Sequence, residues 1–377
     1  MKRKIGVVLL VLLGLFVVLS NLSVSSDEIA NWVNTNYWRN NPKKAYPSWY
    51  CLFSERTPTV FLKGSEIERD GFRMYQFLYN HTYKDEPSDI RFYNLSQGEK
   101  VEIVVLRPDG ILVPLYNDTA ISSNLTLNID MRMEVISTIS SVFNLSREEY
   151  VFTPPTKLLF SSYKGKTLKG EYVFEIRIRG NSTSFVEILG TCYGILGTDS
   201  YGRDMWVGFV KGMNNTLYFA FSTTFITVVL GALLGLLSGY FEGRVAGLLT
   251  FLLEVLIALP MLPFLVLLVW LSSTQGVGLE VEINPLVLML FIAILSLGKF
   301  AKTVRMIVMK EKVSEYVKAS ISVGASSLWI IRRHIFPVIR EFSFRHFTIL
   351  LPKMVALVSV LGFFGLIPGT NWGVFHD

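Results

Sequence analysis

Apolar runs that can cross a lipid bilayer stand on both sides of a long polar stretch in this chain. The first run, Ile5–Ser20, follows Lys-Arg-Lys and reaches about 20 residues when Asn21–Val24 are added, which matches a hydrocarbon core of about 30 Å. The later runs are Leu217–Phe241, Val245–Leu271, Pro285–Leu297 and Phe347–Ile367, of which the third is short for a span unless it extends towards Val308. The sequence therefore predicts a membrane α-helical bundle of about five transmembrane helices, with an inserted, β-rich α+β extracytoplasmic domain.

Charges between the runs orient the predicted helices. The loop 272–284 carries only Glu280 and Glu282, whereas the segment 299–345 holds ten basic residues: Lys299, Lys302, Arg305, Lys310, Lys312, Lys318, Arg332, Arg333, Arg340 and Arg345. Because basic loops stay in the cytoplasm, we place the N-terminus and 299–345 inside the cell and 25–196 outside the plasma membrane. The predicted domains are 1–24, a first transmembrane helix; 25–196, extracytoplasmic; and 197–377, transmembrane, with the cytoplasmic loop 299–345.

Both ends of the chain leave alternatives open. The first run is either a transmembrane helix or a signal peptide, although no A-x-A-like cleavage site follows it. Five crossings from a cytoplasmic N-terminus leave Asp377 outside. The net charge of +6 does not indicate nucleic acid, because the basic residues flank apolar runs instead of forming a stripe with aromatic residues. Membrane lipid is the expected surrounding.

The polar stretch 25–196 has the composition of a soluble domain. Lys100–Leu106 and Glu171–Arg179 are short and β-branched, which predicts strands; Arg107–Gly110 predicts a turn and Met131–Phe143 a helix. Glycosylation acceptor triplets, N-x-S/T, occur at Asn80, Asn94, Asn117, Asn124, Asn144 and Asn181. Cys51 and Cys192 are the only cysteines, and since export permits disulfides we predict a bond between them over two separate buried thiols.

Within the cytoplasmic segment, a set of mostly apolar residues recurs at helical spacing on both sides of Gly324. They are Tyr316, Ala319, Ser320 and Val323, then Leu328, Ile331, Ile335 and Val338/Ile339. This pattern predicts two short amphipathic helices that meet at a glycine turn. Periodicity alone favours an ordinary loop or a helix lying on anionic lipid over a protein-docking device.

The stretch Glu315–Ile339 resembles the EAA loop of ABC-importer permeases. That family has Glu-Ala-Ala, three residues, Gly, and Pro thirteen residues on; here Lys318, Ala319, Ser320, Gly324 and Pro337 fall at those positions. Lys318 replaces the glutamate of the family. Other segments resemble the dipeptide/oligopeptide branch in the same order: GTDSYGRD (197–204), GYFEG (239–243), Glu254 before Pro260, AKTVR (301–305) and LGFFGLIPGTNWG (361–373).

The resemblance implies a permease subunit that moves short peptides and performs no covalent chemistry. It implies six transmembrane helices, a second homologous permease, two cytoplasmic ATPases that dock on Glu315–Pro337 through residues including Tyr316, and an extracytoplasmic substrate-binding protein. ATP would be used by those partners, and no cofactor would bind this chain. The final helix of the family would be missing here or supplied by a partner. Oligosaccharide import remains an alternative, as does a membrane receptor or assembly protein with an extracytoplasmic ligand-binding domain.

Other chemistries lack their motifs. The GKT at Gly165–Thr167 has Phe160 where a phosphate-binding loop needs glycine, and the four histidines are too scattered to predict a metal site. Gly231, Gly235 and Gly239 favour helix packing over substrate contact. Glu254 and Lys353 fall within apolar runs, where charges usually face the bundle interior; for Glu254 a structural ion pair with a nearby arginine and a pathway role are both open.

Overall fold

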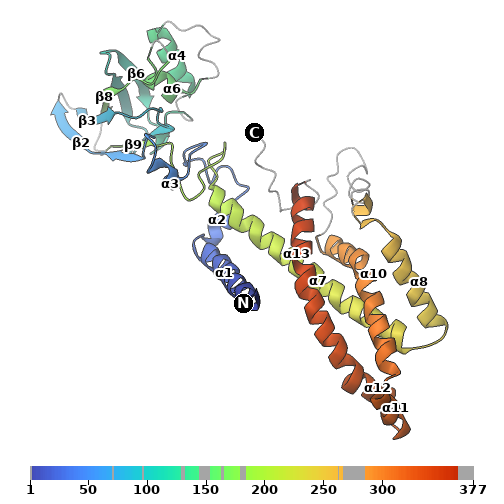
Figure 1. Ribbon diagram of the computed structural model, residues 1–377. Helices are drawn as coiled ribbons and strands as arrows, with labels where there is room; N and C mark the ends of the chain where they lie inside the picture. The colour runs from blue at the N-terminus through green and yellow to red at the C-terminus, as the bar shows by residue number, and fades with distance from the viewer. Residues whose placement is uncertain are drawn as a thin grey trace, which may run out of the picture. The chain divides into compact units, whose positions relative to one another are not determined.

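The computed structural model describes residues 2–69, 72–95, 97–128, 132–143, 153–162, 165–178, 184–261, 263–265 and 285–363. The chain divides into two compact units, Met1–Val210 and Lys211–Asp377, which are described separately. The boundary falls inside one long helix, α7 (Met205–Tyr240) (Figure 1).

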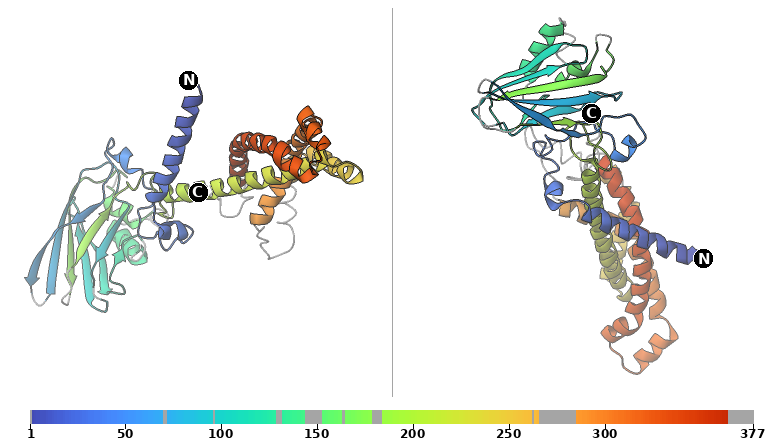
Figure 2. Two further views of the ribbon diagram at one scale, coloured as in Figure 1. Left: turned by 90° about the horizontal axis from the view of Figure 1, so that it is seen from below. Right: turned by 90° about the vertical axis from the view of Figure 1, so that its left-hand side faces the viewer.

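The first unit contains two antiparallel sheets. One has the strand order β1-β9-β4-β7 and the other β2-β3-β8-β5-β6. Figure 2 shows the second sheet with its strands side by side. The strands are β1 (Val60–Leu62), β2 (Gly64–Arg69), β3 (Phe72–His81), β4 (Asp89–Tyr93), β5 (Lys100–Leu106), β6 (Leu112–Thr119), β7 (Leu125–Thr126), β8 (Gly170–Ile178) and β9 (Phe185–Leu189).

One hydrophobic core joins the two sheets. It includes Ile90 and Val186 from the first sheet and Phe77, Ile103 and Phe174 from the second. Along β8 every second residue is buried, because successive side chains of a strand point to opposite faces. The predicted strands and turn are present: Gly110 lies at φ +82° and donates its N–H to Arg107 O at 2.9 Å.

Helices complete the first unit. They are α1 (Lys2–Leu22), α2 (Ser26–Ala30), α3 (Ser48–Cys51), α4 (Arg132–Phe143) and α6 (Pro155–Phe160). Helix α4 is the predicted helix and packs against β6 and α6. Among the acceptor triplets, Asn80, Asn94, Asn117 and Asn124 are exposed; Asn144 and Asn181 lie outside the described residues.

The second unit is helical. Besides most of α7 it contains α8 (Arg244–Ala258), α10 (Pro285–Lys312), α11 (Glu315–Ser322), α12 (Ser327–Ile330), a π-helical turn η1 (Ile331–Ile335) and α13 (Phe336–Phe363). In the described part of the chain, three helices are long and apolar enough to cross a membrane: Met205–Tyr240, Leu286–Lys312 and Ser327–Gly362. The run Val245–Leu271 is described only in part, and the C-terminal motif after Phe363 lies outside the described residues.

Two helices are longer than the hydropathy indicated. Helix α10 continues past Leu297 to Lys312, so Lys299, Lys302 and Arg305 lie on a helix and not in a loop. Helix α13 begins at Phe336 and therefore includes Arg340 and Arg345. The connection between α10 and α13 is thus 313–335, shorter than the predicted loop 299–345, because basic side chains are compatible with the ends of long helices. We call residues 313–335 the coupling segment.

Small residues allow α7 and α10 to approach closely. A Cβ on Gly235 would lie 2.5 Å from Ala301 O and 2.6 Å from Val304 Cβ. A Cβ on Gly239 would lie 2.8 Å from Arg305 O. The Gly231–Gly239 pattern therefore serves helix packing, as predicted.

Candidate functional site

The coupling segment consists of two short helices joined by a tight turn. Figure 1 shows α11 and α12 together at the end of the bundle where α10 ends and α13 begins. Gly324 lies at φ +89°, in the region that favours glycine, and donates its N–H to Ile321 O at 2.9 Å. Ser326 begins α12 by accepting the N–H of Trp329 at its side-chain oxygen, at 3.4 Å. The predicted pair of helices at a glycine turn is present.

One side of the coupling segment is anchored in the bundle. Val317, Ile330 and Ile335 are buried in a cluster that also contains Val304 and Val308 of α10, Val228 of α7 and Ile339 of α13. At the end of α10, the ammonium of Lys312 donates to Tyr240 O at 3.0 Å and pairs with Glu242 at 2.7 Å. The turn after α7, the end of α10 and the coupling segment therefore form one packed structure.

The other side of the segment is open. Val323 is 90% exposed and Leu328 75%, and Tyr316, Ala319 and Trp329 are also exposed. A hollow of about 660 Å³ at the turn is lined by Ala319, Ser320, Val323, Gly324, Ala325, Ser326 and Trp329. The predicted stripe before Gly324 is thus largely exposed, whereas Ile335 and Ile339 of the stripe after it are buried. Val317 and Ile330, which the spacing missed, complete the buried side.

Charged and polar residues of the predicted site lie around this open side. Lys318, at the position of the family's glutamate, pairs with Glu315 at 3.1 Å, and both side chains are exposed. The hydroxyl of Ser320 lies 3.1 Å from His334 Nε2, which ties α11 to η1. Pro337 directly follows the π-helical turn η1, inside a helical stretch that runs from Ser327 to Gly362; proline lacks the N–H for a normal helical bond, and helix irregularities of this kind are common beside it. The structure therefore brings together Glu315, Tyr316, Lys318, Ala319, Ser320 and Gly324 at one surface, with Pro337 just after η1 in the helical stretch that follows.

Glu254 is not part of this surface. Its carboxylate lies 3.2 Å from the ammonium of Lys302, so α8 and α10 are joined by an ion pair. The partner is a lysine and not the arginine that we considered. Both side chains remain about half exposed, which leaves a pathway role untested.

The GTDSYGRD motif forms the turn that leads from the first unit into α7. A Cβ on Gly197 would lie 2.2 Å from Ala45 O, so only glycine fits there. Asp199 accepts the backbone N–H of Arg203 at 2.9 Å and forms a buried ion pair with its side chain at 2.6 Å. Asp204 accepts the N–H of Trp206 at 2.8 Å and so caps the start of α7. Each charged or glycine position that this chain shares with the motif has a structural role.

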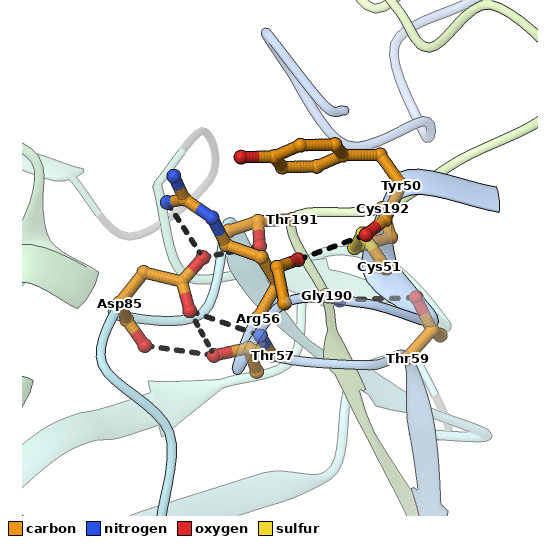
Figure 3. Close-up of a disulfide and its surroundings, with 10 residues drawn as sticks. Tyr50, Cys51, Arg56, Thr57, Thr59, Asp85, Gly190, Thr191 and Cys192 are labelled. Carbon is orange, nitrogen blue, oxygen red and sulfur yellow. Dashed lines mark hydrogen bonds and ion pairs between the residues drawn. A yellow bond between two sulfur atoms is a disulfide. The ribbon is translucent and has the colours of Figure 1, made fainter. Parts of the chain in front are cut away.

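A disulfide lies near the same turn. Cys51 and Cys192 are bonded, with their Cα atoms 6.3 Å apart, within the usual range for a disulfide. In the surroundings of this bond (Figure 3), Asp85 accepts the N–H of Thr57 at 2.9 Å and pairs with Arg56 at 3.5 Å. The disulfide thereby joins α3, near the start of the domain, to the segment that follows β9.

Comparison with known proteins addresses the second unit. Residues 231–376 match the family described as "Binding-protein-dependent transport system inner membrane component". Residues 231–376 are therefore similar to permeases of this family, and we call them the permease domain. Proteins named as peptide transport system permeases from Brucella suis biovar 1, Brucella abortus biovar 1 and Brucella melitensis biotype 1 are each 26% identical over 184 residues. These matches confirm the resemblance to ABC-importer permeases of the peptide-transport type.

The extent of the match is limited. It covers 48% of this chain and 58% of each relative, so the chain spans somewhat more than half of the length of the curated relatives. The coupling segment and α13 fall within the matched permease domain. The two-sheet unit lies before it.

Proposed function

We propose that this chain is a permease subunit of an ABC importer and that ATPase subunits dock on the open side of the coupling segment. The observation that carries the proposal is the two-sided character of that segment. Val317 and Ile330 fix one side in the bundle, while Val323 and Leu328 leave an apolar surface open on the other. An exposed apolar patch of this kind is typical of a protein-docking surface.

The mechanism follows from packing. A docked ATPase that shifts α11 also shifts Val317, and Val317 lies against Val308 and Val304 of α10. Close-packed side chains transmit displacement because they cannot be compressed into empty space. The movement therefore reaches α10 and α7, and exposure of a transport cavity to one side of the membrane would alternate with exposure to the other.

The proposed partners are a second homologous permease, two cytoplasmic ATPases and an extracytoplasmic binding protein. The proposed substrate is a short peptide, in keeping with the printed names of the Brucella relatives. This chain would hydrolyse no ATP itself. The proposed topology keeps the N-terminus and the coupling segment in the cytoplasm, with residues 25–196 outside.

Copurification tests the proposal. When the tagged wild-type chain is purified from native membranes, an ATPase should copurify with it. The ATPase should not copurify with the Val323→Asp variant, because this substitution places a charge on the open apolar surface. Val33→Asp is the matched control, because Val33 is 74% exposed but belongs to the other unit. Retention of the ATPase by Val323→Asp, or equal loss with Val33→Asp, would contradict docking at this segment.

A further inference from the structure

A cavity of about 720 Å³ lies among the helices of the permease domain, and no residue of the coupling segment lines it. Its walls come from the end of α8, residues 259–261 and 263, α10 and α13. Most of the lining is apolar, including Leu256, Leu295, Leu350 and Leu357. Two ammonium-bearing residues, Lys299 and Lys353, interrupt it.

Both lysines lie far from the ends of their helices. Lys299 is fourteen residues after Pro285 and thirteen before Lys312, or about 20 Å from each end of α10 at 1.5 Å per residue. Lys353 lies ten residues before Phe363, or about 15 Å from the end of α13. Both helices are long and apolar enough to cross a membrane, and from these positions along them we place both positive charges within the depth of the bilayer.

Neither charge is neutralised within the part of the permease domain that the structure describes. No carboxylate there lies within ion-pair distance of Lys299 or Lys353, and the nearby Glu254 pairs with Lys302. The hydroxyl of Ser296, also in the lining, is committed to Ile292 O at 2.7 Å. A charged side chain at this depth is costly, and such residues commonly mark a substrate or ion pathway.

We propose that Lys299 and Lys353 form a transient binding site for the terminal carboxylate of a peptide in transit. The inference rests on the proposed importer function and specifies its substrate class. A carboxylate would supply the missing negative charge, whereas a neutral oligosaccharide would not. The apolar walls suit peptide side chains of varied sequence, because contacts with them need no fixed hydrogen-bond pattern.

The test compares one tripeptide with a free C-terminal carboxylate and the same tripeptide amidated. Uptake is measured in proteoliposomes that contain the complete transporter with its ATPases and binding protein. The readout is the ratio of free-acid uptake to amidated uptake. The binding protein is the same in every experiment, so its own preference for one peptide cannot cause a difference in this ratio between variants. We expect Lys299→Gln and Lys353→Gln each to lower this ratio about tenfold, as for the loss of one charged contact, with amidated uptake unchanged.

Two matched variants control for the change of residue. Lys310→Gln removes a charge from the same helix outside the cavity and should leave the ratio unchanged. Lys353→Arg keeps the charge and should preserve the ratio. An unchanged ratio in both cavity variants, or an equal loss of both peptides, would overturn the site.

The lipid composition separates a substrate site from a lipid site. If the effect of the lysine variants occurs only in liposomes with anionic lipid, the cavity binds a headgroup and the proposal is wrong. If wild-type transporter takes up neither peptide, the proposed peptide importer itself fails. If the wild-type transporter takes up both peptides and the lysine variants have the same free-acid to amidated uptake ratio as wild type, only the proposed carboxylate site is wrong.

Discussion

Replacing Gly235 by alanine should push α7 and α10 apart and destabilise the protein. The structure predicts a larger loss of stability at Gly235 than at the other glycines compared below. The added Cβ would lie 2.5 Å from Ala301 O and 2.6 Å from Val304 Cβ. Neither atom moves when a side chain changes rotamer, so the helix backbones must shift. Overpacking of this kind costs about 1–3 kcal/mol. At Gly231 the nearest atom is Phe300 Cδ1 at 2.6 Å, which a ring movement can displace, so the cost there should be smaller.

Gly247→Ala is the matched control. A Cβ at Gly247, on α8, meets nothing within 4 Å. All three substitutions gain the same helix propensity, about 1 kcal/mol, so differences among them report packing alone. The assay is denaturant or thermal unfolding of the purified chain in detergent, followed by tryptophan fluorescence. We expect stability in the order Gly247→Ala, Gly231→Ala, Gly235→Ala, and a Gly235→Ala protein as stable as Gly247→Ala would refute the reasoning.

Three further predictions concern other parts of the chain. Gly324→Val has no clash but forces a β-branched residue to φ +89°, at a cost of about 1–3 kcal/mol; it should reduce substrate-stimulated ATP hydrolysis of the assembled transporter while membrane insertion persists. Removing the disulfide by Cys51→Ala with Cys192→Ala frees a loop with a sequence separation of 141 and should lower the free energy of unfolding by at most about 5 kcal/mol; wild-type thermal unfolding should then depend on reductant and the double variant should not. Burial raises the pKa of Asp89 to about 7, so between about pH 4 and 7 the folded protein keeps a proton on Asp89 that the unfolded chain has lost. The free energy of unfolding should therefore fall as the pH rises from about 4 to 7. Asp89→Asn should reduce this pH dependence, as measured by thermal unfolding across the same range.

Local patterns in the sequence were enough to predict the elements whose stability is local. Strand β5 has the predicted bounds, Lys100–Leu106, because alternating β-branched residues fit a half-buried strand. The turn at Gly324 was predictable because glycine alone marks the change of direction between two periodic stretches. The disulfide pairing was predictable because the chain has only two cysteines, both in the stretch that we predict to be exported.

Which side chains are buried and where a helix begins depend on tertiary contacts, and the sequence did not reveal those contacts. Spacing selected Tyr316 and Val323 as an apolar stripe, yet Val317 is the residue that α10 covers. Helix α7 begins at Met205, well before its apolar run, because Val207 and Val210 pack against Val24 and Trp38 of the first unit. Hydropathy measures only the lipid-facing preference of a residue and not these contacts.

Lys299 illustrates why charge alone was a poor guide within the permease domain. The positive-inside rule placed it at the start of a cytoplasmic loop, since it begins a run of basic residues. In the structure the apolar face of α10 continues past it through Phe300, Ala301, Val304 and Val308, all of which are buried. A helix whose buried side continues for two further turns does not end at its first lysine. Lys299 therefore lines a cavity in the bundle instead of a cytoplasmic loop. Its predicted place in the topology does not show whether it binds substrate, and the ratio of free-acid to amidated peptide uptake is the measurement that does.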